Sequence, residues 1–218
     1  MEVLWEKEDK EVDRKAKVFI LEGISGSGKT TQLDKVKEFL EGRGQQVVEI
    51  VEPSDEVRRW AVEYKKRPDR DPYVELAKFQ ADRIAIYERE MEQRLTEENL
   101  TFLLGRSFLS TLVYQGIMGG VPLELIDRMN RFYPKPDLAF IFDCDPATAL
   151  ARIESDTTRT RTGTTADEKL RKMIILRAGY VAVAGTYDYA RIIEAGGTES
   201  DTFSQIEKEL RRSLDNWF

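Results

Sequence analysis

The amino-acid sequence predicts an α/β fold in which a five-stranded parallel sheet lies between two layers of helices. Three observations lead to this prediction. Short β-branched or aromatic runs alternate with longer helical patterns, which is typical of βαβ units. A glycine-rich stretch joins the first apolar run to the first helical pattern. The chain has 218 residues, which suits one domain with a sizeable core.

The expected elements follow one another along the chain in this alternating order. The apolar runs predict strands over 17–22, 45–51, 100–104, 137–143 and 190–195. Helical periodicity predicts helices over 29–41, 55–66, 72–97, 107–117, 122–132, 146–155, 165–185 and 201–215. Residues 1–16 are dense in charge, and we expect a loosely packed extension there, followed by a single domain over 17–218.

Composition excludes some classes of protein. The net charge of −6 argues against a protein that coats nucleic acid, because that role needs a clustered cationic surface. Cys144 is the only cysteine, so an internal disulfide is impossible and a reducing compartment fits. No apolar run approaches the ~20 residues of a membrane span, and the N-terminus is charged rather than signal-like. We therefore expect a cytoplasmic protein that binds neither nucleic acid nor membrane.

The stretch from Gly23 to Thr30 reads G-I-S-G-S-G-K-T, a complete P-loop pattern between a predicted strand and a predicted helix. Its glycines let successive backbone N–H groups turn inward around an anion, and the helix N-terminus adds its positive dipole end. Lys29 can then reach the β- and γ-phosphates of a nucleotide, and the Thr30 hydroxyl can hold Mg²⁺. The alternative is a glycine-rich turn that binds nothing, and the flanking strand and helix argue against it.

The remaining sequence decides between the classes of P-loop protein. The chain has no guanine-reading N-K-x-D, and a motor would need more length and extra switch segments. Small kinases surround the phosphoryl group in flight with an arginine-containing lid. The segment "RIESDTTRTRTG", 152–163, has that composition and follows the fourth predicted strand, so we expect a lid over about 152–168. For an isolated arginine pair, a solvated surface loop is the alternative.

The chain resembles the thymidylate kinase family, a branch of the P-loop nucleoside monophosphate kinases, from about Val18 to its C-terminus. Glu22-Gly23 is similar to the E-G that precedes the P-loop of that family. Four further segments match family patterns in the right order: "KFQADR" (78–83), "GRSFLSTLVYQG" (105–116), "KPDLAFIFDCDPATALARI" (135–153) and "RAGYVAVA" (177–184). The resemblance implies a homodimer that transfers phosphate from ATP, with Mg²⁺, to a pyrimidine deoxynucleoside monophosphate, dTMP first among them.

The acceptor site is also implied by this resemblance. Phe79 and Arg83 share one helix face. The Phe79 ring can stack on a base, and the Arg83 guanidinium can fork onto a phosphate. Taken alone, Phe79 is more typical of a core position, because aromatic side chains are common core fillers. Arg106 follows a strand and matches the arginine that binds the acceptor phosphate. The implied acceptor residues are Glu52, Pro53, Arg58, Phe79, Arg83, Arg106, Ser110, Thr111, Tyr114 and Gln115.

The donor and catalytic residues are expected around the P-loop. The ATP site comprises Gly23, Ser25, Gly26, Ser27, Gly28, Lys29, Thr30, Thr31 and, near the donor base, Arg152. The P-loop contains no arginine, so Lys29, Arg106, Arg159 and Arg161 are expected to act on the phosphoryl group in transfer. We expect Thr30 and Asp143 to hold the metal.

Two positions depart from the family pattern, because Ser25 and Gly105 each stand where the family has a carboxylate. A serine can still hydrogen-bond a sugar hydroxyl, but less strongly than a charged group. Glycine beside Arg106 removes a partner that orients the arginine or a Mg²⁺-bound water. Two alternatives to a dTMP kinase therefore stay open: a kinase for another nucleotide or nucleoside, and a weakly active nucleotide-binding homologue.

Overall fold

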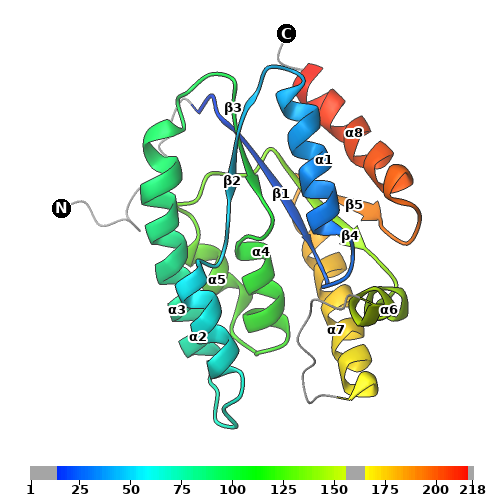
Figure 1. The fold of residues 1–218 in the computed structure, drawn as a ribbon. Coiled ribbons are helices and arrows are strands. Elements are labelled where there is room, and N and C mark those ends of the chain that lie inside the picture. The colour runs from blue at the N-terminus through cyan, green and yellow to red at the C-terminus, as the bar shows by residue number, and fades with distance from the viewer. Residues whose placement is uncertain (1–13, 156–164, 216–218) are drawn as a thin grey trace, which may run out of the picture.

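A twisted parallel sheet with helices on both faces forms the body of the protein, as Figure 1 shows for the computed structural model. The structure describes residues 14–155 and 165–215. Within these residues the sheet has five strands in the order β2-β3-β1-β4-β5. The strands are β1 (Lys17–Gly23), β2 (Gln46–Ile50), β3 (Leu100–Leu104), β4 (Leu138–Asp143) and β5 (Ala190–Glu194). The predicted three-layer α/β fold is confirmed.

Helices from both halves of the chain cover the sheet. They are α1 (Lys29–Glu41), α2 (Asp55–Tyr64), α3 (Pro72–Ile86), α4 (Phe108–Thr111), α5 (Leu123–Met129), α6 (Pro146–Ser155), α7 (Ala166–Ala184) and α8 (Glu199–Asp215). In Figure 1, α1 and α8 run side by side over one face. Helices α4 and α7 pack against the central strands from the other face. The sheet therefore lies between two helical layers.

The central strands are buried along their whole length, which explains their continuous apolar sequences. Every residue of β1 and of β3 is buried, including Lys17, Glu22 and Thr101. A parallel strand covered on both faces needs apolar side chains on both sides, so its sequence does not alternate. The buried Glu22 is an exception at the end of β1, and its charge requires local partners.

The strand register gathers the loops that carry polar side chains at one edge of the sheet. Ile20 of β1 pairs with Leu104 of β3, and Gly23 pairs with Phe142 of β4. The stretch that follows β1 therefore lies beside the residues that follow β3 and β4. The chain leaves β1 and β3 toward opposite sides of the sheet, and such switch points are where open α/β sheets bind ligands.

Local sequence signals set several helix starts. The Ser54 hydroxyl accepts from the Val57 amide and caps α2, at 3.4 Å. Asp71 caps α3 through the Tyr73 amide at 2.7 Å. Thr165 and Glu168 form a reciprocal capping box at the start of α7. These short polar side chains satisfy amides that the helix itself leaves unpaired.

The predicted helix over 72–97 was wrong in its second half. Helix α3 ends at Ile86, and the chain continues as a π-helical turn, Tyr87–Met91, and a 3₁₀ turn, Glu92–Arg94. The wider turn keeps Tyr87 and Met91 in the core, where both are buried. The expected helix over 107–117 likewise consists of α4 followed by a π-helical segment, Leu112–Ile117.

The expected extension over 1–16 lies outside the described residues except for its last three. The Arg14 guanidinium donates to Asp137 at 2.6 Å, and the amides of Lys15 and Ala16 both donate to the Leu95 carbonyl at 2.9 Å. Among the helices that the structure describes, none combines the length and the apolar character needed to cross a membrane.

Candidate active site

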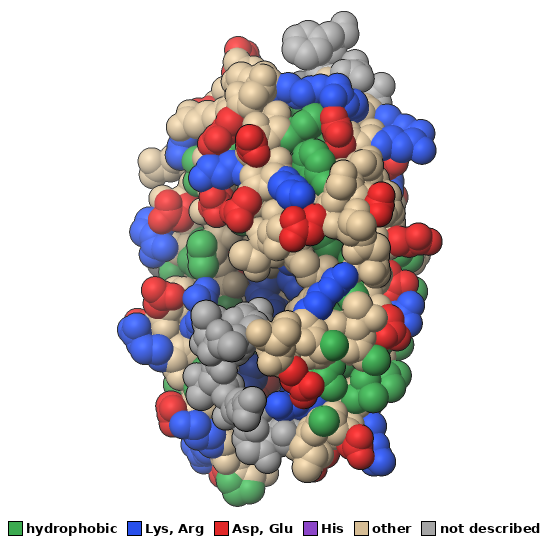
Figure 2. Space-filling view, turned by 45° about the vertical axis from the view of Figure 1, so that its right-hand side comes forward, with side chains coloured by type: hydrophobic (Ala, Val, Ile, Leu, Met, Phe, Trp, Pro, Cys, Tyr) green, Lys and Arg blue, Asp and Glu red, His purple; other side chains and the backbone are tan. Residues whose placement is uncertain are grey.

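Three adjoining cavities lie along the carboxyl edge of the sheet. The first, which we call the acceptor cavity, has a volume of about 620 Å³ and lies between α2, α3, α4 and α7. The second, the P-loop cavity, has about 370 Å³, and the third, the donor-base cavity, about 330 Å³. Figure 2 shows a hollow in the middle of one face, with Lys and Arg side chains on part of its wall. Ser25 and Arg106 line both of the first two cavities, so they mark the boundary between them.

The P-loop has the backbone of an anion cradle. Gly26 and Gly28 have φ of +80° and +93°, in the left-handed region that favours glycine. A Cβ on Gly26 would also lie 2.3 Å from the Ala149 carbonyl oxygen, so no larger residue fits. Helix α1 then begins at Lys29 with no side-chain cap and no acidic residue in its first turn. Its first amides and its dipole are therefore directed toward the P-loop cavity.

Lys29 lies at the centre of this loop. Its ammonium group donates to the carbonyls of Gly23 and Ile24, each at 2.8 Å. Thr30 and Gly105 line the same cavity. No Asp or Glu is among the described residues that line it. A Mg²⁺ ion, which keeps several waters and binds substrate phosphates, fits here with Thr30 as its protein ligand.

Arg106 is held at the boundary of the two cavities by groups around the buried Glu22. The Glu22 carboxylate accepts from the Ser107 amide at 2.7 Å and from the Ser110 hydroxyl at 2.8 Å. That hydroxyl also accepts from Arg106 at 3.3 Å and lies 2.9 Å from the Tyr180 hydroxyl. Burial opposes the charge of Arg106, but Tyr180, Tyr114 and Glu22 outweigh it and raise the pKa of the guanidinium.

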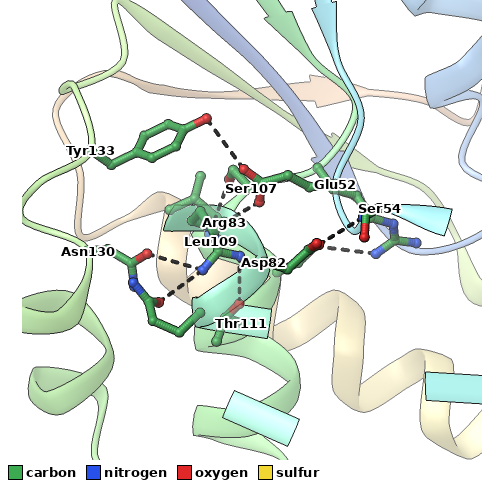
Figure 3. Close-up of polar contacts among 12 residues, drawn as sticks. Glu52, Ser54, Asp82, Arg83, Ser107, Leu109, Thr111, Asn130 and Tyr133 are labelled. Atoms are coloured by element: carbon green, nitrogen blue, oxygen red, sulfur yellow. Dashed lines mark hydrogen bonds and ion pairs between the residues drawn. The ribbon is translucent and has the colours of Figure 1, made fainter. Parts of the chain in front are cut away.

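Arg83 forms a buried ion pair at the deep end of the acceptor cavity, as Figure 3 shows. Its Nε donates to the Glu52 carboxylate at 2.8 Å. One terminal nitrogen donates to Gln80 at 3.3 Å and Asn130 at 3.1 Å, and the other donates to Thr111 at 3.1 Å. A guanidinium has five N–H groups, so one remains. The expected fork of Arg83 onto a phosphate is therefore not available, and a single donor is left for a ligand.

Glu52 carries the charge that balances Arg83. Burial raises the pKa of the Glu52 carboxyl, while the Arg83 charge and hydrogen bond oppose this shift. Tyr133 also donates to Glu52, at 3.4 Å. On the rim of this group, Asp82 accepts from the Ser54 amide at 2.8 Å. The network fixes the loop after β2 against α3 and gives the cavity a rigid floor.

The wall of the acceptor cavity combines an aromatic ring with an amide. Phe79 makes an edge-to-face contact with Trp60, with ring centroids 6.3 Å apart, and still lines the cavity. Gln115 donates from its Nε2 to Glu75 at 2.8 Å, which fixes the orientation of the amide. Its carbonyl oxygen has no hydrogen-bond donor within the described residues, so it is available to a ligand.

The structure brings all of the expected acceptor residues to one cavity: Glu52, Pro53, Arg58, Phe79, Arg83, Arg106, Ser110, Thr111, Tyr114 and Gln115 line it. The sequence reasoning missed other lining residues, among them Lys65, Arg70, Glu75, Asp82 and Lys172. Glu75 had a usable signal, because it lies four residues before Phe79 on the same helix face. Lys65, Arg70 and Lys172 had no such sequence signal, since they come from separate elements.

The donor-base cavity adjoins the P-loop cavity through Gly28, Thr31 and Arg152, which line both. Arg152 donates to the Ala195 carbonyl at 3.0 Å and so links α6 to the loop after β5. Gln32 donates to the Glu199 carbonyl at 2.9 Å from α1. The expected donor residue Arg152 is thus placed here, and the loop 195–199 is an addition that the sequence did not indicate.

Asp143 has a different partner from the one expected. Its carboxylate forms a two-pronged ion pair with Arg177 of α7, which lowers the pKa of the carboxyl. Asp143 is also not among the described residues that line the P-loop cavity. No cluster of three or more His, Cys, Asp or Glu side chains that could hold a metal occurs in the described part of the chain. Arg159 and Arg161 lie outside the described residues.

Comparison with known proteins finds relatives that share one family. The sequence model of one family, thymidylate kinase, matches residues 21–206. A probable thymidylate kinase of Pyrobaculum aerophilum is 34% identical over 197 residues, which cover 88% of this chain and 95% of that protein. A probable thymidylate kinase of Methanosphaera stadtmanae is 32% identical over 89% of this chain and 97% of that protein. A thymidylate kinase of Caldicellulosiruptor saccharolyticus is 31% identical over 90% of this chain and 96% of that protein.

Proposed function

Because the chain belongs to the thymidylate kinase family, we propose that it transfers the γ-phosphoryl group of ATP to dTMP and forms dTDP and ADP. The observation that carries this proposal is the adjacency of two cavities, one built on a P-loop and one on the acceptor residues, that share Ser25 and Arg106. The comparisons give no support to another acceptor or to a binding-only homologue.

In this proposal the donor binds along the second and third cavities. The triphosphate occupies the cradle of Gly26, Gly28 and the α1 amides, and Lys29 faces the β- and γ-phosphates. The base lies beside Arg152. The Thr30 hydroxyl would hold Mg²⁺, which would supply charge neutralisation at the phosphates.

The acceptor lies in the first cavity with its base on the Phe79 ring. The remaining Arg83 N–H is a donor, and the free Gln115 carbonyl oxygen is an acceptor. Thymine offers the complementary pair, the C4 carbonyl and the N3–H. Cytosine offers an amino group and a bare N3 at these positions, so both contacts are lost. The cavity therefore selects thymine or uracil over cytosine.

The phosphate of the acceptor lies at Arg106, where the two cavities meet. Arg58 faces the same cavity and retains an exposed guanidinium. The fixed position of Arg106, through Ser110 and Glu22, holds the attacking oxygen toward the γ-phosphoryl group without reorganisation during transfer. Arg159 and Arg161 remain predicted to stabilise the negative charge of the phosphoryl group in transfer. The homodimer also remains a prediction.

An assay of ADP formation over a panel of acceptors tests this proposal. With ATP and Mg²⁺, we expect the highest kcat/KM for dTMP, a lower value for dUMP and a much lower value for dCMP. Purine monophosphates and thymidine should be poor acceptors. A preference for dCMP or thymidine over dTMP, in protein that unfolds cooperatively, would contradict the assignment of the acceptor cavity.

A further inference from the structure

A carboxylate on α3 sets the direction of a buried amide in the wall of the acceptor cavity. Gln115 is buried in the π-helical segment after α4, and its Nε2 donates to the Glu75 carboxylate at 2.8 Å. The backbone carbonyl of Gln115 accepts from the Val121 amide at 3.0 Å, so the main chain that carries this side chain is also held. Both Glu75 and Gln115 line the cavity. The contact with Glu75 therefore decides which end of the amide is available to a ligand.

The chemistry of the two groups allows one orientation only. An ionised carboxylate accepts hydrogen bonds and donates none, whereas a side-chain amide has a donor end and an acceptor end. Only the NH₂ group of Gln115 can therefore face Glu75. Within the described residues the carbonyl oxygen of this amide has no donor of its own. A buried acceptor without a partner is costly, so this oxygen favours a ligand that brings a donor.

The two amides that accept from Arg83 are oriented in another way. Gln80 through Nε2 and Asn130 through Nδ2 each donate to a backbone carbonyl at 2.7 Å. Their oxygens then accept from Arg83 at 3.3 and 3.1 Å. Because the main chain sets these two directions, no single side-chain replacement reverses them. The direction of Gln115 depends on one side chain, Glu75, and one substitution can release it.

In an inference that rests on the proposed function, we propose that Glu75 is a positioning residue that makes the acceptor site select thymine and uracil over cytosine. Glu75 holds the Gln115 oxygen available to the base, where it accepts from the N3–H of thymine or uracil. Cytosine has no hydrogen at N3, so two acceptors would face each other and both would stay unsatisfied. Glu75 thus acts on the choice of base through Gln115.

Glu75→Gln is the substitution that releases the amide. It keeps the shape of the side chain but gives it a donor end. Gln115 can then turn its oxygen toward residue 75 and its NH₂ group toward the cavity, where that group can donate to N3 of cytosine. The contact at C4 does not change, because Arg83 still offers an N–H there. One of the two obstacles to cytosine is removed, so selectivity should fall without being reversed.

Measurement of kcat/KM for dTMP, dUMP and dCMP, with ATP and Mg²⁺, tests this inference. We expect Glu75→Gln to lower the dTMP-to-dCMP ratio at least about tenfold, because an unsatisfied buried group costs about that factor or more. The dTMP-to-dUMP ratio should stay as in wild type, since both bases present the same N3–H and C4 carbonyl. The matched control is Glu63→Gln, which removes the same charge from α2, outside the cavity lining, and should leave both ratios unchanged.

A double-mutant cycle shows whether Glu75 acts through Gln115. Gln115→Leu removes both ends of the amide. In that background Glu75→Gln should leave the dTMP-to-dCMP ratio unchanged, because its effect passes through the amide. An effect of the lost charge on the acceptor phosphate would change kcat/KM for all three acceptors alike and would leave the ratios as they were.

Three results overturn the inference: an unchanged dTMP-to-dCMP ratio in Glu75→Gln, the same fall in that ratio when Gln115 is already leucine, and a matching change in the dTMP-to-dUMP ratio. If wild-type protein prefers dTMP to dCMP, these results leave the proposed function intact. Wild-type protein that prefers dCMP contradicts the proposed function instead.

Discussion

Restoring a carboxylate at residue 105 is expected to raise turnover of dTMP. Gly105 follows β3, precedes Arg106 and lines the P-loop cavity together with Thr30. A Cβ added there meets one described neighbour, the Leu33 Cδ1 atom, at 3.5 Å, which is ordinary van der Waals contact. The side chain of Gly105→Asp therefore has room, and its carboxylate is directed to the P-loop cavity, where the proposed function places the metal and the transferring group.

The size of the effect follows from what already positions Arg106. The Glu22 carboxylate accepts from the Ser110 hydroxyl at 2.8 Å, and that hydroxyl accepts from Arg106 at 3.3 Å. A group placed directly at the site of charge development is typically worth about 10²–10³ in kcat. Because Ser110 already orients part of the guanidinium, we expect a smaller gain of about tenfold.

The assay compares kcat and the Mg²⁺ dependence of dTMP phosphorylation in wild type and three variants. Gly105→Asp should raise kcat and lower the Mg²⁺ concentration for half-maximal rate. Gly105→Ala and Gly105→Asn are the controls for volume and for polarity without charge, and we expect neither to raise kcat. A fall in kcat for Gly105→Asp, with Gly105→Asn unaffected, would refute the reasoning, because it would mean that the site repels a second negative charge.

Three further predictions concern single side chains. Lys29→Met should lower kcat at least about 10³-fold, since no other side chain of the loop supplies a charge at the phosphates. The melting temperature should be unchanged. Near-normal initial rates would contradict the P-loop assignment. Phe79→Leu should raise the KM for dTMP about three- to tenfold with little change in kcat, because stacking holds ground state and transition state alike, and an unchanged KM would return Phe79 to a purely structural role. Asp143→Asn should lower the melting temperature at neutral pH, and this effect should shrink progressively as the pH falls below about 3.9. Arg177 lowers the pKa of Asp143, so the ionised pair stabilises the fold fully above the unfolded-state pKa and loses this contribution as the pH falls through the lower folded-state pKa. A higher Mg²⁺ requirement with an unchanged melting temperature would instead favour a metal ligand.

Much of the fold was predictable because the relevant signals are local. The strand β3, Leu100–Leu104, has the bounds that its apolar run predicts, and the P-loop pattern places Gly28 where a positive φ is needed. That the expected acceptor residues line one cavity was also predictable, because the segments that carry them resemble family patterns. The end of helix α3 at Ile86 was not predictable, because the π-helical turn that follows depends on how Tyr87 and Met91 fit the core rather than on helix propensity.

The parts of the site that the sequence did not indicate depend on tertiary structure. Lys65, Arg70 and Lys172 lie up to 107 residues apart in the chain and line one cavity only because α2, the next loop and α7 surround it. The partner of Asp143 is similarly remote, on α7 at Arg177. The spacing of residues along one segment carries no information about contacts between distant segments. The structure alone therefore shows that these charges lie around one cavity.

The most direct test of the account follows the phosphoryl group from the P-loop cavity to the acceptor cavity. Protein is incubated with ATP labelled at the γ-phosphate, Mg²⁺ and dTMP, and the nucleotides are separated. The account predicts that the label appears in the terminal phosphate of dTDP in a one-to-one ratio with ADP, and that omission of dTMP abolishes ADP formation. Label released as inorganic phosphate, or ADP formed at the same rate without an acceptor, would contradict it.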